Sequence, residues 1–243
     1  MKLITDALIL RETNVGEADR FITALTREQG VLRAAARGVR RVKSRNAAAT
    51  GMLAHSRLTL VEGRSGFVVT DAQPLHMFFG LRDDLQKLSL AQYFCELTIA
   101  LCPREESAEQ PLRLLLNALH FLSEGRDPQL LKSLVELRLL AQAGYRPALD
   151  GCAACGRQDG ALALMPAAGV LCCPDCGNGL PLSPPVLGAM RVFTTAPLSD
   201  CFALKLPPAE AGELEAVSEA FLLAQLGRGF PSLTFYHQLN NPT

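Results

Sequence analysis

The chain has 243 residues, of which 49% are hydrophobic, so its composition excludes an intrinsically disordered protein and predicts globular domains. Its 24 Lys and Arg residues balance its 24 Asp and Glu residues, which by itself argues against a nucleic-acid partner. The distribution of charge reverses this reading, because residues 1–80 contain 12 basic and 7 acidic side chains, a net charge of +5. This asymmetry predicts a module that faces a polyanion, attached to a part with another role.

No targeting or membrane-spanning segment is expected. Asp6 interrupts the first apolar residues too early for a signal peptide, and Gln92 and Glu96 break the apolar stretch over 88–102. We therefore expect a soluble, cytoplasmic protein. In that reducing compartment, cysteines in paired C-x-x-C spacing indicate a metal site before they indicate disulfides.

Short β-leaning segments with glycine-marked turns fill the N-terminal region. They predict a five-stranded OB-type barrel, although the number of strands alone does not separate it from an SH3-like barrel. Taken with the helices expected beyond it, the fold class is α+β. The expected strands cover residues 7–13, 19–26, 30–38, 56–62 and 67–71, with a hairpin turn at Gly63–Gly66.

A cationic run, RAAARGVRRVKSR, leaves the third expected strand, and no acidic residue occurs from Gln29 through Val61. Unpaired Lys and Arg side chains neutralise backbone phosphates and release counterions, so the run predicts DNA binding without sequence preference. A solvated loop is the alternative reading. The candidate DNA-binding residues in the run are Arg33, Arg37, Arg40, Arg41, Lys43 and Arg45. Arg11, Arg57 and Arg64 are possible additions, although each is better read as an ordinary exposed arginine.

Aromatic side chains for base stacking are sparse in this region. Phe21 and Phe67 are the only aromatic residues before Phe78, and phenylalanines in strands usually belong to the core. We therefore expect binding that depends on charge, similar for single and double strands and strongly sensitive to salt.

Beyond Phe79 the hydrophobic period changes from two residues to about 3.6, which indicates helices. A leucine stripe over 112–122 predicts one helix, and Asp127 with Pro128 marks the start of the next. Cys95 and Cys102 lie in this region and are expected to be buried thiols.

Prolines mark a connection over 181–185, and Pro208 opens what we expect to be the last helix, which ends at Gly227. The tail from 229 to 243 is expected to pack back onto the helices.

Four cysteines form two C-x-x-C pairs, Cys152 with Cys155 and Cys173 with Cys176, and a glycine follows each pair. Seventeen residues separate the pairs. This spacing is typical of a structural Zn²⁺ site in which four thiolates close the tetrahedral coordination sphere and leave no position for water. Redox dithiols or a disulfide stay open as alternatives, and Cys172 stays open as a substitute for Cys173.

The stretches ALILRETNVGEADR and LTREQGVLRAAARGVRRVKSR precede the helices, the four-cysteine knuckle and the last helix. These stretches and this order of elements resemble the RecO family of bacterial recombination and DNA-repair mediators. The resemblance spans nearly the whole chain. Its most specific parts are the turn from Gly16 to Asp19 and the run from Gly38 to Arg45.

The resemblance implies an N-terminal OB fold that binds single- and double-stranded DNA and anneals complementary strands. It also implies partnership with RecR and with single-stranded-DNA-binding protein (SSB), assistance to RecA loading on SSB-coated DNA, and a nucleoid-associated location. Many family members carry a basic cluster after the last helix, where this chain has Phe230-Pro231-Ser232-Leu233. We therefore attribute no DNA contact to this tail.

Two other classes of function compete with a DNA-binding mediator. An enzyme is not expected, because the chain lacks a phosphate-binding loop, an H-E-x-x-H motif and a G-x-S-x-G elbow. A zinc-ribbon module that binds nucleic acid in the transcription or translation machinery is the second alternative. The expected domains are a DNA-binding barrel over 1–80 and a helical domain over 81–243, with the zinc knuckle at about 148–180.

Overall fold

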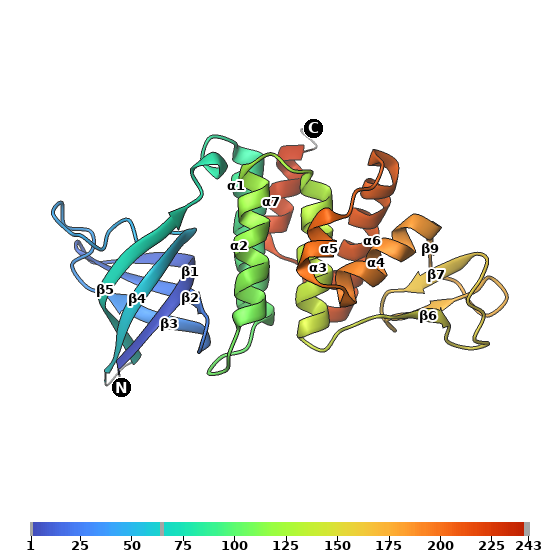
Figure 1. Cartoon of the computed structure of the whole chain (residues 1–243), viewed down its shortest axis with the longest axis horizontal. Coiled ribbons are helices and arrows are strands. Elements are labelled where there is room, and N and C mark those ends of the chain that lie inside the picture. The colour runs from blue at the N-terminus through green and yellow to red at the C-terminus, as the bar shows by residue number, and fades with distance from the viewer. Residues whose placement is uncertain (1, 64–65, 241–243) are drawn as a thin grey trace. The chain divides into compact units, whose positions relative to one another are not determined.

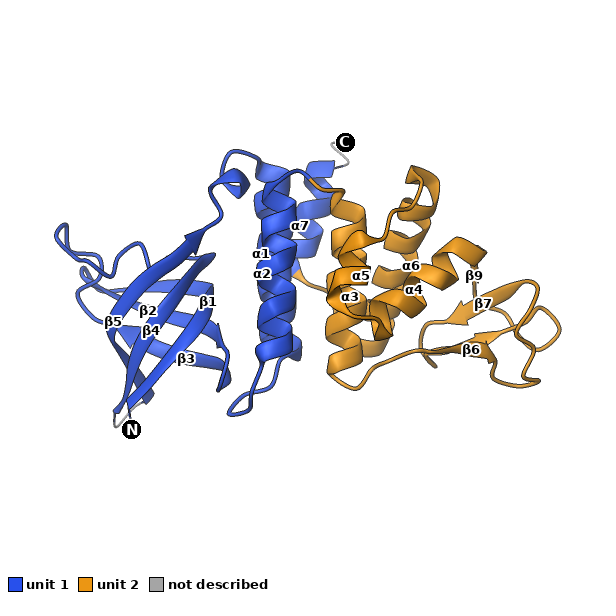
Figure 2. Cartoon of the chain, in the orientation of Figure 1, with its two compact units in different colours: residues 1–125, 231–243 blue, residues 126–230 orange. Residues whose placement is uncertain are grey.

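The computed structural model describes residues 2–63 and 66–240 (Figure 1). It divides into two compact units, of which unit 1 contains residues 1–125 and 231–243 and unit 2 contains residues 126–230 (Figure 2). Arg64 and Ser65, the two central residues of the predicted hairpin turn, lie outside the described residues, whereas Gly63 and Gly66 on either side of them pair as predicted. Within the described ranges, no helix is both long and apolar enough to cross a bilayer.

Unit 1 begins with a closed barrel in the order β1-β2-β3-β5-β4, in which β1 also pairs with β4 (Figure 1). Neighbouring strands are antiparallel except for β3 and β5, which pair in parallel. The predicted five-stranded OB-type barrel is confirmed. The strands are β1 (Lys2–Val15), β2 (Asp19–Thr26), β3 (Gly30–Ala36), β4 (Ala54–Gly63) and β5 (Gly66–Met77).

Side chains along each strand alternate between the interior and the outer surface of the barrel, and the inward-facing ones fill its core. Ile22 and Ala24 of β2 belong to the enclosed core, so the residues between and beside them point to the outer surface. Phe67 packs against this core, as expected. The expectation that Phe21 is a core residue is wrong, because Phe21 is on the outer face, where the Arg33 guanidinium lies 4.4 Å from the ring centroid.

Helices and a short 3₁₀ turn complete the described part of unit 1. They are η1 (Phe79–Leu81), α1 (Leu85–Leu101), α2 (Glu109–Ser123) and α7 (Pro231–Asn240). The Asp84 carboxylate caps α1 by accepting hydrogen bonds from the amides of Gln86 and Lys87, at 2.9 and 3.1 Å. The tail forms α7, which packs against α1, and the amide and hydroxyl of Ser232 donate to the carboxylate of Glu96.

The helices of unit 2 are α3 (Pro128–Gln142), α4 (Pro184–Thr195), α5 (Leu198–Ala203) and α6 (Pro208–Leu226). The predicted start of α3 is confirmed, because the Asp127 carboxylate accepts a hydrogen bond from the amide of Gln129 at 2.9 Å. The predicted ends of α6 at Pro208 and Gly227 are also confirmed, but the prediction that it is the last helix is wrong, because α7 follows it. The prediction that Pro184 lies in a connection is wrong, because this proline begins α4, where its missing N–H is not needed.

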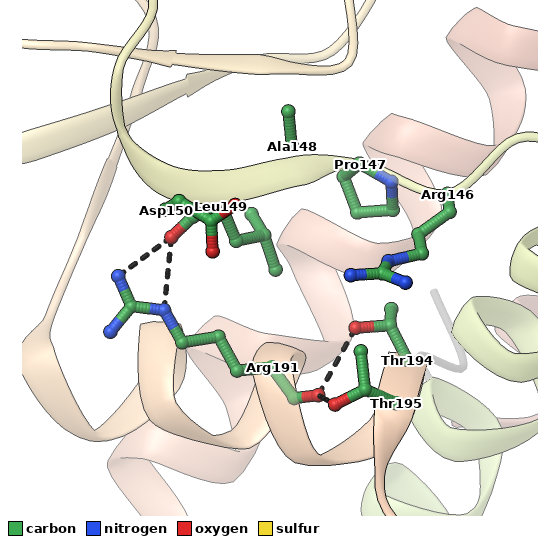
Figure 3. A pocket seen from close by; sticks show the side chains of 8 residues that line it. All are labelled: Arg146, Pro147, Ala148, Leu149, Asp150, Arg191, Thr194 and Thr195. Atoms are coloured by element: carbon green, nitrogen blue, oxygen red, sulfur yellow. Dashed lines mark hydrogen bonds between the residues drawn. The ribbon is translucent and has the colours of Figure 1, made fainter. Parts of the chain in front are cut away.

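A small sheet in the order β6-β8-β7-β9 carries the cysteine knuckles. Its strands are β6 (Ala148–Cys152), β7 (Leu162–Met165), β8 (Val170–Cys172) and β9 (Leu180–Leu182). Arg191 of α4 donates through Nε and Nη2 to the carbonyl oxygen of Leu149, at 2.9 and 2.6 Å, across a hollow lined also by Arg146 and Asp150 (Figure 3). This bidentate contact ties the sheet to α4.

A largely buried ion network joins α3 to α6. Lys132 Nζ lies 2.9 Å from Glu136 Oε1 and 2.7 Å from Glu219 Oε2, and the side chains of Lys132 and Glu136 are 0% exposed. The hydroxyl of Ser218 donates to the second carboxylate oxygen of Glu136 at 2.7 Å. Burial works against the charge of Lys132, but the two carboxylates outweigh it and raise the pKa of this ammonium.

Lys132→Met should strongly destabilise unit 2, because it leaves the buried Glu136 carboxylate without its cation. The expected loss is about 3–5 kcal/mol in the free energy of unfolding, measured by urea denaturation followed by circular dichroism. The exposed Lys205 provides the matched control, and Lys205→Met should change stability by less than about 0.5 kcal/mol. Equal stabilities of the two variants would contradict this account of the network.

Candidate metal centre and nucleic-acid interface

Cys152, Cys155, Cys173 and Cys176 converge at the end of the small sheet, with their sulfur atoms all within 4.8 Å of one another. Each pair sits on a tight turn, in which the amide of Gly156 donates to the Cys152 carbonyl at 2.8 Å and the amide of Cys176 donates to the Cys173 carbonyl at 3.0 Å. Tetrahedral coordination with metal–sulfur bonds of about 2.3 Å requires sulfurs about 3.8 Å apart. The sulfurs of Cys155 and Cys173 are 3.7 Å apart, so the cluster fits a metal ion.

Electrostatics at the cluster also favour a bound cation. Backbone amides of Cys155 and Cys173 donate toward the Cys152 sulfur and lower the pKa of that thiol to about 6. Hydrogen bonds with the thiols of Cys173 and Cys155 raise the pKa of Cys176 to about 12. Of these two thiols, one ionises readily in the metal-free cluster and the other resists ionisation, and a bound divalent cation would favour the thiolate form of both.

The geometry selects Cys173 over its neighbour. Among the described residues, the candidate ligand group contains Cys173 and leaves out Cys172, whose side chain is buried beside Gly177. Cys95 and Cys102 lie in α1 and at its end, where burial raises the pKa of each thiol to about 12. Cys95 is buried as predicted and Cys102 is half-buried, and a thiol with such a pKa stays protonated near neutral pH.

The knuckles themselves offer little to a nucleic acid. Arg157 is the only basic residue of the region, and its guanidinium forms an ion pair with Asp175 at 2.8 Å. This exposed pair links one knuckle to the other, and it engages the charge that a phosphate would need. The knuckles therefore give no support to a phosphate contact at the cluster.

The cationic run forms β3 and the loop that follows it. The loop is rooted at the β1–β2 turn, where the amide of Gly38 donates to Asp19 Oδ1 at 2.7 Å and Arg40 Nη1 donates to the Gly16 carbonyl at 2.8 Å. The side chains at 37, 40, 41, 43 and 45 are all exposed. The loop thus presents its charges outward from a fixed base.

Ion pairing separates the arginines of the barrel into two groups. Arg20 pairs with Glu12 at 3.0 Å, while Arg27 and Arg57 share Asp6 at 3.1 Å each. Arg57 was a candidate DNA-binding residue, and its charge is already engaged. In the part of the chain that the structure describes, no ion pair is found for the other candidates, which are Arg11, Arg33, Arg37, Arg40, Arg41, Lys43 and Arg45.

Two family models together match most of the chain. The model described as "Recombination protein O N terminal" matches residues 1–78, which contain the barrel. The model described as "Recombination protein O C terminal" matches residues 82–234, which contain the helices and the cysteine cluster.

Full-length relatives give the same result. A protein of Symbiobacterium thermophilum named "DNA repair protein RecO" is 36% identical over 245 residues, which cover 97% of this chain and 97% of the relative. A protein of the same name from Roseiflexus sp. is 36% identical over a match that covers 95% of this chain and 83% of the relative. Another from Dehalococcoides mccartyi is 33% identical over a match that covers 89% of this chain and 87% of the relative.

Cys173→Ala should abolish retention of metal by the purified protein, because it removes one of four sulfurs from the cluster. Cys172→Ala is the matched control, and it should retain metal as the unchanged chain does. Metal per chain after gel filtration, measured by plasma mass spectrometry, compares the two. The reverse pattern would show that Cys172 is the ligand.

Proposed function

Because the chain belongs to the RecO family of bacterial DNA repair and recombination proteins, we propose that it binds DNA through the cationic loop of its barrel. The family consists of non-enzymatic recombination mediators, in agreement with the sequence prediction that the chain is not an enzyme. The single observation that carries the proposal is a set of exposed cations in the loop without acidic partners among the described residues.

Phosphates of DNA are the partners that such cations fit. Each phosphate neutralised by Lys or Arg releases condensed counterions, and this gain is independent of base sequence. The proposal therefore covers both single- and double-stranded DNA. Annealing of complementary strands follows if the barrel neutralises two strands together and so lowers their mutual repulsion.

The remaining partners follow from the family. We propose that the chain works with RecR and with SSB, and that it assists RecA loading on SSB-coated single strands. Such a protein would act in the cytoplasm, associated with the nucleoid. The proposed division of labour assigns DNA binding to residues 1–80 and protein contacts to the helical residues 81–243, and the bounds of the two family models support this division.

Zn²⁺ is the ion that we propose for the cysteine cluster. Four thiolates in tetrahedral arrangement are the donor set that zinc prefers in structural sites, and they leave no open position for substrate. The ion would hold both knuckles on the small sheet, as a scaffold without a catalytic role.

Replacing Arg40, Arg41 and Lys43 by Ala should weaken binding to single-stranded DNA and make it less sensitive to salt. For three lost phosphate contacts, the slope of log affinity against log salt concentration should become shallower by about 2. Fluorescence anisotropy with a labelled oligonucleotide at several salt concentrations measures this slope.

The control for this triple variant removes exposed arginines away from the loop, with Arg82→Ala and Arg113→Ala, and should leave the slope unchanged. Thermal melting of both variants checks that the barrel is intact, because Arg40 also bonds to the Gly16 carbonyl. If the triple variant keeps the original slope, DNA binds elsewhere. A parallel titration with RNA tests the alternative of an RNA-binding zinc ribbon.

Removal of zinc should unfold the knuckle region while the barrel stays folded. Structural zinc contributes on the order of 10 kcal/mol to local folding, so a strong chelator should expose the backbone amides of residues 148–182 to rapid hydrogen exchange. One zinc ion per chain is expected beforehand. Cys102→Ala, outside the cluster, serves as the control and should retain zinc. Slow exchange of this region after complete loss of metal would contradict a structural role.

A further inference from the structure

A row of side chains crosses the outer face of β1, β2 and β3. Arg11 pairs in register with Thr23, and Thr23 pairs in register with Arg33. Directly opposed residues share a face in antiparallel strands. Thr23 lies between the core residues Ile22 and Ala24, so all three members of the row face outward.

A β-bulge brings Arg11 into this row. Ala7 and Ile9 of β1 belong to the core, and strict alternation would send residue 11 inward as well. The register shifts between Ile9 and Arg11, which inserts one extra residue and reverses the phase of the strand. Bulges of this kind redirect side chains at functional positions, and here the bulge places a guanidinium beside Thr23.

A second structural feature places Arg104 beside this row of side chains. The segment after α1 docks on the β2–β3 turn, where the amide of Val31 donates to the Pro103 carbonyl at 2.9 Å and the amide of Glu105 donates to the Gln29 carbonyl at 3.0 Å. The approach is so close that a Cβ atom on Gly30 would lie 2.2 Å from the Pro103 oxygen. The absence of a Cβ atom at Gly30 therefore allows the segment that carries Arg104 to dock here.

Together these elements line an open hollow of about 460 Å³ in unit 1. Three arginines line it, and among the described residues Glu105 is the only acidic side chain in the lining. No ion pair is found for any of these arginines within the described ranges, in contrast to Arg20, Arg27 and Arg57. The lining includes Arg11, Thr23, Gln29, Arg33, Phe67 and Arg104.

Arg33 is held in place before any ligand arrives. Its guanidinium lies over the ring of Phe21, which restricts the side chain without neutralising its charge. A charge that is already oriented loses less conformational entropy when it binds. The hollow thus combines positive charge, hydroxyl and amide donors and a preset geometry, which suits a phosphate group.

We propose that this hollow is a second phosphate site, built around Arg11, Arg33 and Arg104, and that one single strand of nucleic acid occupies it together with the cationic loop. The proposal rests on the proposed function. The loop is rooted beside Asp19, and Thr23 lies four residues along the same strand, about 13 Å away at the usual rise of a β-strand. A strand of nucleic acid carries one negative charge per nucleotide, so it can contact the loop and the hollow together. A single carboxylate could occupy only one of these two sites.

The decisive variant is Arg11→Ala with Arg104→Ala, which removes two charges and leaves the loop unchanged. Binding to a dT oligonucleotide longer than the ~16 nucleotides that one OB fold contacts should become less sensitive to salt. For two lost single-strand contacts the slope should become shallower by about 1.4. The control pair Arg82→Ala with Arg113→Ala should keep the original slope.

The outcomes separate this inference from the proposed function. If the loop variant loses slope but Arg11→Ala with Arg104→Ala behaves as the control pair does, the second site is wrong and the proposed function stands. If neither variant changes the slope, both are wrong.

A probe at the site tests its occupant directly. The chain contains no Trp, so Phe21→Trp introduces a single fluorophore under Arg33. Its emission should change as the dT oligonucleotide binds, with the same midpoint as the anisotropy titration, and binding without any change in emission would overturn the assignment. An acidic peptide of Asp and Glu should leave the emission unchanged, and a saturable response to it that Arg11→Ala with Arg104→Ala removes would identify the hollow as a peptide site instead.

Discussion

Closure of the barrel leaves each strand side chain only two places, the enclosed core or the outer surface. No strand edge remains open between β1 and β4, and the apolar interior accepts no unpaired charge. The cations of these strands must therefore pair with an acid at the surface or face outward without one. The candidate nucleic-acid surface is a consequence of this constraint, because the unpaired cations collect on one face and in the loop above it.

Features that depend on neighbouring residues in the sequence could be predicted. Alternating side chains located the five strands, although β1 and β5 extend further than the alternation indicated. The capping residue Asp127 predicted the start of α3, and the C-x-x-C spacing predicted that the four cysteines meet. In each case the signal lies within a few residues of the feature, so it is readable before the chain folds.

Features that depend on distant partners could not be predicted in the same way. The bulge in β1 becomes visible only against the register of β2, and the role of Gly30 only once the segment at Pro103 docks on it. The ion network of Lys132 was missed as well, because one of its partners, Glu219, comes from another helix. Arg104 was missed for the same reason, since it lies far along the chain from the barrel strands.

The neutral charge of the chain is compatible with strong binding to a polyanion, because counterion release depends on the phosphates that are neutralised and not on the net charge of the protein. What matters is which cations have no acidic partner. In the barrel, Asp6 and Glu12 engage three arginines and thereby remove them from competition for phosphate. The buried acids of unit 2 are likewise engaged, since Glu136 is bound to Lys132 in the interior. Ion pairing elsewhere thus leaves the available positive charge at the loop and the adjoining strand face. The net charge of the whole sequence does not reveal this local excess.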